Sequence, residues 1–180
     1  DVGRIVKAKG KEFLKITDRK KELLKTSGGK YVAPAPIESK FKEDFLIEQL
    51  MVVGEGKKFV SALIVPAAEA LKDWCECNDV DIKITPAPLN DTLFCISADT
   101  LKNPKVIAKI QEVINGFNPG FSHIEQIKEF RLLGDPWDVS TGELTPTMKL
   151  KRKVIREKYD GVIKEICVAD AEMIEYQQLL

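Results

Sequence analysis

The chain has 180 residues, of which 44% are apolar and 31% are charged. This composition is typical of one folded domain, or one domain with an appendage, and excludes wholesale disorder. Lysine and arginine total 28, as do aspartate and glutamate, and this balance argues against a dedicated nucleic-acid binder. Because the sequence begins at Asp1 without a methionine, a signal peptide or a membrane-spanning run, we expect an excised fragment of a cytoplasmic protein.

Strands and turns dominate the N-terminal third. The sequence predicts strands over residues 4–8 and 13–17. Propensity alone favours a helix over 18–25, and the adjacent glycines at 28–29 then impose a tight turn. A helix with prolines in its first turn is expected from 34 to about 42.

The middle of the chain predicts a hairpin and a helix. Two apolar strands, 47–53 and 59–65, flank a Gly- and Lys-rich loop over 54–58. A helix is expected over 67–77, and the stretch 79–100, which contains two prolines, is predicted to be an irregular surface excursion.

Helices dominate the C-terminal part. Asn103 is a predicted cap for a helix that starts at Pro104, and apolar residues at 107, 110, 113, 114 and 117 are expected to pack on the core. The other expected elements are a short helix at 121–127, a strand at 129–133, a loop at 134–148 and helices over 151–165 and much of 168–178. Together these elements predict an α+β fold, with a small mixed or antiparallel sheet, N-terminal β-hairpins and flanking helices.

Reactive side chains are few. Cys75 and Cys77 form a C-x-C without the further ligands that a zinc site needs, so no metal site is predicted and the four cysteines are interpreted as reduced thiols. The single histidine, His123, has no evident triad partner. Six bases within 149–158 precede an acidic stretch over 160–180; they form either a solvated basic face or an anion-handling site.

Two segments carry a more specific signal. Residues 17–38 read TDRKKELLKTSGGKYVAPAPIE, and residues 142–152 read GELTPTMKLKR. In this order and with this separation, they resemble the C-terminal domain of a long-chain fatty acid–CoA ligase of the adenylate-forming (AMP-binding) superfamily. The resemblance covers nearly all of the chain and is weakest around 79–100.

The resemblance implies a mobile C-terminal lid on a larger enzyme. Residues 1–17 would be the end of the N-terminal domain and the strands that lead to the hinge, 18–22 the hinge linker and 23–180 the lid. The large N-terminal AMP-binding domain is then absent from this chain. The helix favoured over 18–25 is replaced in this interpretation by a hinge and a β-hairpin over 23–32.

The resemblance also implies roles for single residues. Lys149 matches the lysine that serves adenylation, although Met148 stands where many members have glycine and long-chain members often have an apolar residue. Asp18 and Lys21 match the hinge. Asp1 and Arg19 match residues that bind the AMP ribose.

A second group of residues is implied for the thioester step. Gly28 and Gly29 would let the pantetheine arm of CoA pass close to the backbone, and Lys25 would assist. ATP and CoA would be substrates, with Mg²⁺ accompanying ATP, and the fragment alone is expected to bind none of them and to be inactive. Its partner would be the N-terminal domain of the same polypeptide, with no nucleic acid, no transmembrane segment, and peripheral membrane contact possible in the full-length protein.

Two other functions stay open at this point. The chain could be the lid of another adenylate-forming ligase that acts on aryl acids or loads a carrier protein. It could also be a non-enzymatic module that binds anions, nucleic acid or an acidic partner through the bases of 149–158, with an affinity that falls steeply with salt.

Overall fold

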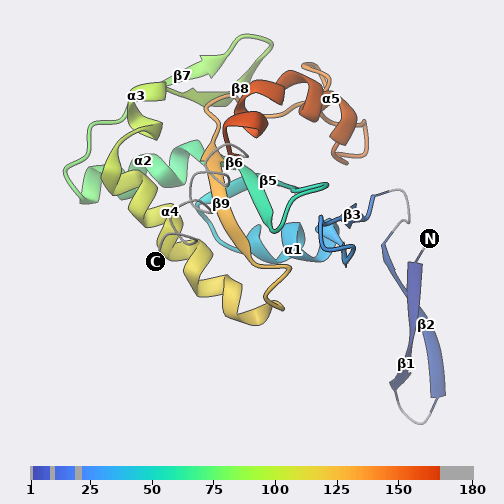
Figure 1. Ribbon diagram of the computed structural model, residues 1–180. Coiled ribbons are helices and arrows are strands. Elements are labelled where there is room, and N and C mark those ends of the chain that lie inside the picture. Colours follow the sequence, from blue (N-terminus) through green and yellow to red (C-terminus); the bar gives the residue numbers. More distant parts are fainter. Residues whose placement is uncertain (1, 9–10, 19–21, 167–180) are drawn as a thin grey trace, which may run out of the picture.

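A three-stranded mixed sheet forms the centre of the computed structural model, which describes residues 2–8, 11–18 and 22–166 (Figure 1). The strands are β5 (Ile47–Val53), β6 (Val60–Pro66) and β9 (Ile127–Leu132), in the order β5-β6-β9. β5 and β6 are antiparallel, with Leu50 opposite Ile64, whereas β6 and β9 are parallel. The predicted mixed sheet and its hairpin are therefore confirmed.

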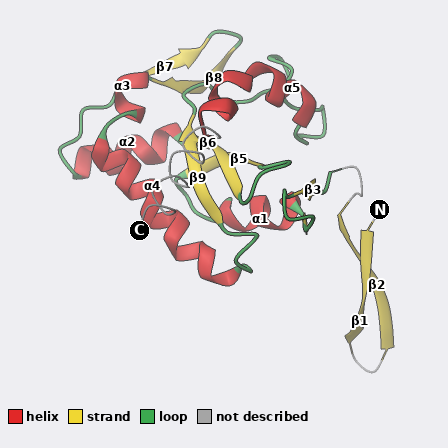
Figure 2. Cartoon of the chain, viewed as in Figure 1, coloured by secondary structure: helices red, strands yellow, loops and turns green. Residues whose placement is uncertain are grey.

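Both faces of this sheet are buried. Leu50 and Val52 pack on one face with the helices α1 (Pro34–Phe41), α2 (Ala68–Cys77) and α4 (Pro104–Phe117). Met51 and Val53 point to the opposite face, where they meet Trp137, Leu144 and the helix α5 (Arg152–Lys158). The period of two along β5 thus sends alternate apolar side chains into two separate cores. Figure 2 shows the helices and loops that surround the strands of this sheet.

Local signals position α4 as expected. The Asn103 side chain accepts a hydrogen bond of 2.9 Å from the backbone N of Lys105, and Pro104 is the first helical residue. The buried stripe consists of Val106, Ile110, Val113 and Ile114. Ile107, which was expected on this face, lies at its edge and is 41% exposed.

The stretch 79–100 is not irregular, so that prediction is wrong. It contains the antiparallel pair β7 (Ile84–Ala87) and β8 (Asn90–Ile96), followed by the short helix α3 (Ala98–Leu101). Proline is tolerated here because β7 pairs with β8 alone among the described strands, so its other edge needs no backbone donor. Buried Ile96 fixes the hairpin by donating its backbone N–H to the carbonyl of Gly134 at 2.9 Å.

Two further hairpins precede the sheet. β1 (Val2–Ala8) pairs with β2 (Lys11–Asp18), and β3 (Leu24–Lys25) pairs with β4 (Tyr31–Val32). The second pair contradicts the helix that propensity favours over 18–25 and confirms the hairpin that the resemblance implies. The physical reason is tertiary: Leu24 and Val32 are opposite each other, and both are buried in the core.

The remaining predictions concern helix ends. The region 121–127 forms a turn before β9 instead of a helix, after a short 3-10 segment, η1 (Asn118–Gly120). The helix expected over 151–165 is interrupted at Tyr159 and continues over 160–166. The helix expected over 168–178 lies outside the described residues. No helix in the described ranges is both long and apolar enough to cross a membrane.

Candidate functional site

A tight loop presents Lys149 to solvent. Leu144 and Leu150 form an isolated antiparallel bridge that closes the loop, and we call residues 144–150 the lysine loop. Inside it, the backbone N of Thr145 donates to the carbonyl of Lys149 at 2.8 Å, and the backbone N of Met148 donates back to the carbonyl of Thr145 at 2.8 Å. Hydrogen bonds within the loop thus hold its backbone. The side chain of Lys149 is exposed.

Met148 adopts a left-handed conformation that few residues tolerate. Its φ is +59°, and its side chain is 64% exposed. Glycine adopts this conformation without steric cost. The geometry therefore gives a physical reason for the glycine that many members of the resembled family carry before the lysine.

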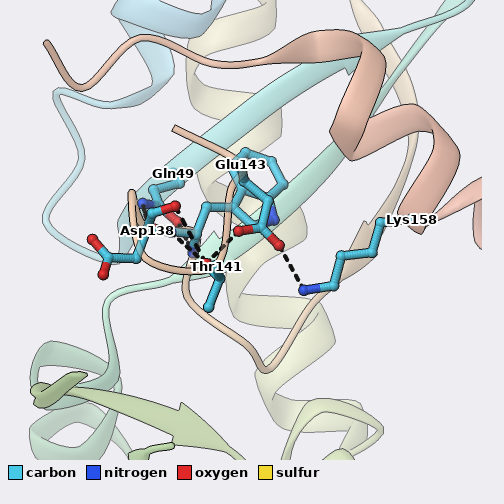
Figure 3. A network of polar contacts seen from close by, with 6 residues as sticks. Gln49, Asp138, Thr141, Glu143 and Lys158 are labelled. Carbon is cyan, nitrogen blue, oxygen red and sulfur yellow. Dashed lines mark hydrogen bonds and ion pairs between the residues drawn. The ribbon is translucent and has the colours of Figure 1, made fainter. Parts of the chain in front are cut away.

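A buried carboxylate supports the base of the lysine loop (Figure 3). Glu143 is completely buried, and its Oε1 accepts a hydrogen bond of 2.6 Å from Lys158 Nζ, while Thr141 donates to its other oxygen. The carbonyl of Glu143 accepts from the backbone N of Lys151 at 2.7 Å. Burial raises the pKa of Glu143, but the hydrogen bonds from Lys158 and Thr141 outweigh burial and lower it, so the carboxylate stays ionised.

The segment before the loop is tied to the central sheet. The side-chain amide of Gln49, on β5, donates to the carbonyl of Trp137 at 2.7 Å and accepts from its backbone N at 2.7 Å. Asp138 follows, and hydrogen bonds, first of all from the Ser140 hydroxyl, lower its pKa. The side chain of Gln49 thus satisfies the backbone N–H and carbonyl of Trp137, as a neighbouring strand would do.

Arg152, at the start of α5, joins the C-terminal end of the loop to α1. Its Nη1 and Nη2 lie 2.6 Å and 2.7 Å from the two carboxylate oxygens of Glu38. Its Nε lies 3.9 Å from Oε2 of Glu22, in the predicted hinge linker. Lys149, Arg152, Glu38 and Glu22 line one groove of about 510 Å³.

The glycine pair lies on a different loop. We call residues 26–30 the glycine turn; Gly29 has a φ of +75°, and the backbone N of Thr26 donates to the carbonyl of Lys30 at 2.8 Å. A Cβ atom on Gly28 would meet nothing within 4 Å, so the turn leaves open space beside its backbone. The groove that Lys149 lines includes neither the glycine pair nor Lys25.

The glycine turn is anchored on the loop between β5 and β6. The backbone N of Ser27 donates to the carbonyl of Lys57 at 2.9 Å, and the backbone N of Gly56 donates to the carbonyl of Lys25 at 2.8 Å. Lys25 is exposed at the end of β3. These backbone hydrogen bonds, together with the burial of Leu24 and Val32, place the second group of predicted residues.

The structure brings together only some of the predicted residues. Lys25, Gly28 and Gly29 lie together on one hairpin, while Lys149 lies on the separate lysine loop. Asp18 is the last residue of β2. Asp1, Arg19 and Lys21 lie outside the described residues, so their predicted roles stay predictions.

Sequence reasoning missed the two ion pairs with buried carboxylates that support the loop. Glu38 offered a signal, since it falls on the same helical face as Ile37 and Phe41, which are buried. A carboxylate on an apolar face needs a cation or several hydrogen-bond donors. Glu143 offered no comparable signal, because it lies in a segment rich in turn residues.

The thiols and acids of the described residues give no second reactive centre. Burial raises the pKa of Cys75, and burial followed by the nearby Asp135 raises that of Cys95. Both thiols are therefore weak nucleophiles at neutral pH. Within the described ranges, no group of three His, Cys, Asp or Glu residues could hold a metal ion.

The chain is similar in sequence to known proteins. Residues 21–87 match the family described as the AMP-binding enzyme C-terminal domain. A long-chain-fatty-acid–CoA ligase of Mycobacterium tuberculosis is 41% identical over 154 residues, which cover 86% of this chain and 24% of that protein. Long-chain-fatty-acid–CoA ligase 6 of Homo sapiens is 32% identical over 155 residues, covering 85% of this chain and 20% of that protein.

Solved structures share the fold. The adenylation domain of a carboxylate reductase from Mycobacterium chelonae superposes with a TM-score of 0.63 at 24% identity, over 89% of this chain and 22% of that one. The chain thus has the same fold as part of that adenylation domain. The family match covers residues 21–87, which are less than half of the chain, and the similarity to the ligases extends over most of it. It spans about a quarter of the length of the curated relatives it matches.

Proposed function

We propose that this chain is the C-terminal lid of an ATP-dependent long-chain fatty acid–CoA ligase, which converts a fatty acid, ATP and CoA into acyl-CoA, AMP and pyrophosphate through an acyl-adenylate. One observation carries the proposal: an exposed lysine stands on a closed loop in a chain 41% identical to a protein named as such a ligase. The N-terminal AMP-binding domain of the same polypeptide would bind ATP and select the acid.

Lys149 would serve the first half-reaction. A carboxylate attacks the α-phosphate of ATP and displaces pyrophosphate, so two anions must meet and negative charge grows on the phosphoryl oxygens. An ammonium group at this point stabilises that charge. The lysine loop suits this role because its backbone hydrogen bonds hold the lysine position fixed while leaving the side chain exposed.

The glycine turn would serve the second half-reaction, in which the CoA thiol attacks the acyl-adenylate and AMP leaves. The open space beside Gly28 suits the close passage of a narrow pantetheine arm, and exposed Lys25 adds positive charge nearby. Because Lys149 and the glycine turn belong to separate loops, rotation of the lid about 18–22, with Asp18 and Lys21 as hinge residues, would present them in turn. Asp1 and Arg19 would contact the AMP ribose.

Two properties of the whole enzyme follow from this proposal. Mg²⁺ would enter with ATP, because the described residues provide no ligand set of their own for it. The enzyme would act in the cytoplasm, with peripheral contact to a membrane where its fatty acids are found.

The distribution of ion pairs disfavours the alternative of an anion-binding module. Four of the six bases in 149–158 are neutralised by acids of the same chain, in pairs that join Arg152 to Glu38, Lys153 to Glu157, Arg156 to Glu55 and Lys158 to Glu143. A polyanion would have to compete with each of these acids. Lys149, in contrast, has no ion-pair partner among the described residues.

ATP–pyrophosphate exchange by the full-length protein tests the proposal. We expect exchange that requires a long-chain acid, and none from the isolated chain of 180 residues. Exchange with aryl or short acids would keep the adenylate-forming chemistry and remove the long-chain substrate. A folded full-length protein that supports exchange with no acid would refute the proposal.

A further inference from the structure

Arg152 holds the lysine loop against α1 through a contact of fixed geometry. It lies three residues after Lys149, and its two terminal nitrogens face the two oxygens of Glu38 at 2.6 Å and 2.7 Å. Two parallel hydrogen bonds between planar groups fix the direction of the guanidinium as well as its distance. A lysine in the same place would keep the charge and lose this directional control.

Glu38 is itself immobilised. It is 7% exposed on the buried face of α1, and its Oε1 also accepts a hydrogen bond of 2.8 Å from the backbone N of Val52 on β5. Arg152 is therefore tied to a helix and to the central sheet through one carboxylate. Its contact with Glu22 is longer, at 3.9 Å, and adds little fixation.

The lysine loop is held from both of its ends. At the N-terminal end, buried Glu143 is fixed by Lys158. At the C-terminal end, Leu150 is bridged to Leu144, and Arg152 follows two residues later. Loss of the fork to Glu38 would free the segment that follows Lys149 while leaving the N-terminal end in place.

We propose that Arg152 is a positioning residue for Lys149, and that its fork with Glu38 sets where the lysine ammonium lies during adenylation. This inference rests on the proposed function, because Lys149 must act in that step. Misplacement of a reacting or charge-stabilising group by about 1 Å can cost on the order of a hundredfold in rate. Arg152 would thus control one half-reaction without touching substrate.

The test compares two half-reactions in the full-length enzyme that carries Arg152→Lys. We expect acid-dependent ATP–pyrophosphate exchange to fall about tenfold or more. Formation of acyl-CoA from preformed acyl-adenylate should stay within about twofold of wild type. Glu38→Asp, which keeps both charges and shortens the carboxylate arm, should reproduce this split if Arg152→Lys fails to fold.

Arg156→Lys is the matched control. It makes the same substitution one turn further along α5, where Arg156 contacts the exposed Glu55 at 2.9 Å. This variant should leave both half-reactions within about twofold of wild type. An equal loss from Arg156→Lys would show that the effect belongs to the helix and not to the fork, and would overturn the inference.

Two further outcomes distinguish a failure of the positioning role from a failure of the proposed function. If Arg152 acts through Lys149, Arg152→Lys should cause no further loss of adenylation in a Lys149→Ala background. A full additional loss there, or equal loss in both half-reactions, refutes the positioning role while leaving the proposed function intact. Absence of acid-dependent exchange in the wild-type enzyme overturns both.

Discussion

The pair formed by Glu143 and Lys158 predicts a pH-dependent loss of stability when the lysine is removed. Glu143 is fully buried, whereas the Lys158 side chain is 42% exposed, and their atoms lie 2.6 Å apart. In the variant Lys158→Met, a side chain of similar length stays while the ammonium group is lost. The carboxylate then keeps Thr141 as its only side-chain donor among the described residues.

The expected magnitude follows from this geometry. Removal of one partner of a fully buried ion pair costs about 3–5 kcal/mol, and a hydrogen bond to a charged group contributes about 1.5–3 kcal/mol. Because Lys158 is partly exposed, water can reach the place of the missing ammonium group and hydrate the carboxylate. The lower of these two free-energy costs therefore applies. We therefore expect a loss of about 2 kcal/mol in the free energy of unfolding at pH 7.

The sign of the pH dependence is fixed by the lowered pKa of Glu143. A carboxylate whose pKa is lower in the folded state stabilises that state above its unfolded pKa, about 4.3 for glutamate. This contribution is lost as the pH falls through the folded pKa. The difference between wild type and Lys158→Met should thus be largest near neutral pH and shrink as the pH falls below about 4.3.

Urea unfolding of the chain, followed by tryptophan fluorescence to which buried Trp137 contributes, measures this difference. Lys164→Met is a matched control, because Lys164 lies 2.6 Å from Asp160 but its side chain is 73% exposed. The control should change stability by less than about 0.5 kcal/mol. Equal losses for the two variants, or a loss for Lys158→Met that does not vary with pH, would refute the argument from burial.

Three further predictions concern the two loops. Lys149→Ala in the full-length enzyme should slow ATP–pyrophosphate exchange by about a hundredfold or more and spare CoA attack on a preformed adenylate; comparable loss in both steps would contradict its role. Gly28→Leu should leave the urea midpoint nearly unchanged, because a Cβ atom at this position meets nothing within 4 Å, and it should slow mainly the thioester step. Gly29→Leu should slow the same step and also destabilise the fold by about 1–2 kcal/mol, because Gly29 has a positive φ. A loss confined to adenylation would contradict the pantetheine path. Met148→Val should destabilise the fold by about 1–3 kcal/mol in the same unfolding assay. Met148→Gly should leave the stability unchanged or raise it by up to about 1 kcal/mol, because glycine relieves the strain at this positive φ; equal losses for the two variants would contradict the assigned strain.

Elements with strong local signals could be predicted from the sequence. The hairpin of β5 and β6 has two apolar runs around a glycine-rich loop, and α4 has a capping Asn103 followed by proline. In these segments, the residues that define the ends also satisfy the backbone groups there. These elements could therefore be predicted without knowledge of distant contacts, although both are buried against the rest of the chain.

Elements determined by distant contacts could not be predicted in the same way. The charged segment before Leu24 favours a helix by propensity, but Leu24 and Val32 gain more by entering the core as a paired strand. Prolines over 79–100 suggested irregular chain, yet a two-stranded hairpin accommodates Pro86 on β7. In both cases burial outweighed the local preference.

The residues of the candidate site also differ in whether local sequence could predict them. Lys149 and the glycine pair belong to short contiguous motifs, so a resemblance of sequence could find them. The fork between Glu38 and Arg152 joins residues 114 positions apart, and no spacing rule relates them. This carboxylate and guanidinium meet only in the folded chain, where Arg152, at the start of α5, reaches Glu38 on α1.

Some bases of the segment 149–158 form ion pairs with acids in the described part of the chain and others do not, and this difference matters for the proposed chemistry. An adenylation lysine must keep its ammonium available for phosphate, so an acid of its own chain beside it would reduce its effect. Arg152 and Lys158 meet the opposite requirement, because their charges are used within the fold to hold the two ends of the lysine loop. Among the described residues, no acid forms an ion pair with Lys149, whereas the buried carboxylates of Glu38 and Glu143 are paired with its neighbours Arg152 and Lys158. The ammonium group of Lys149 therefore stays available for phosphate on a loop that is closed by its own backbone.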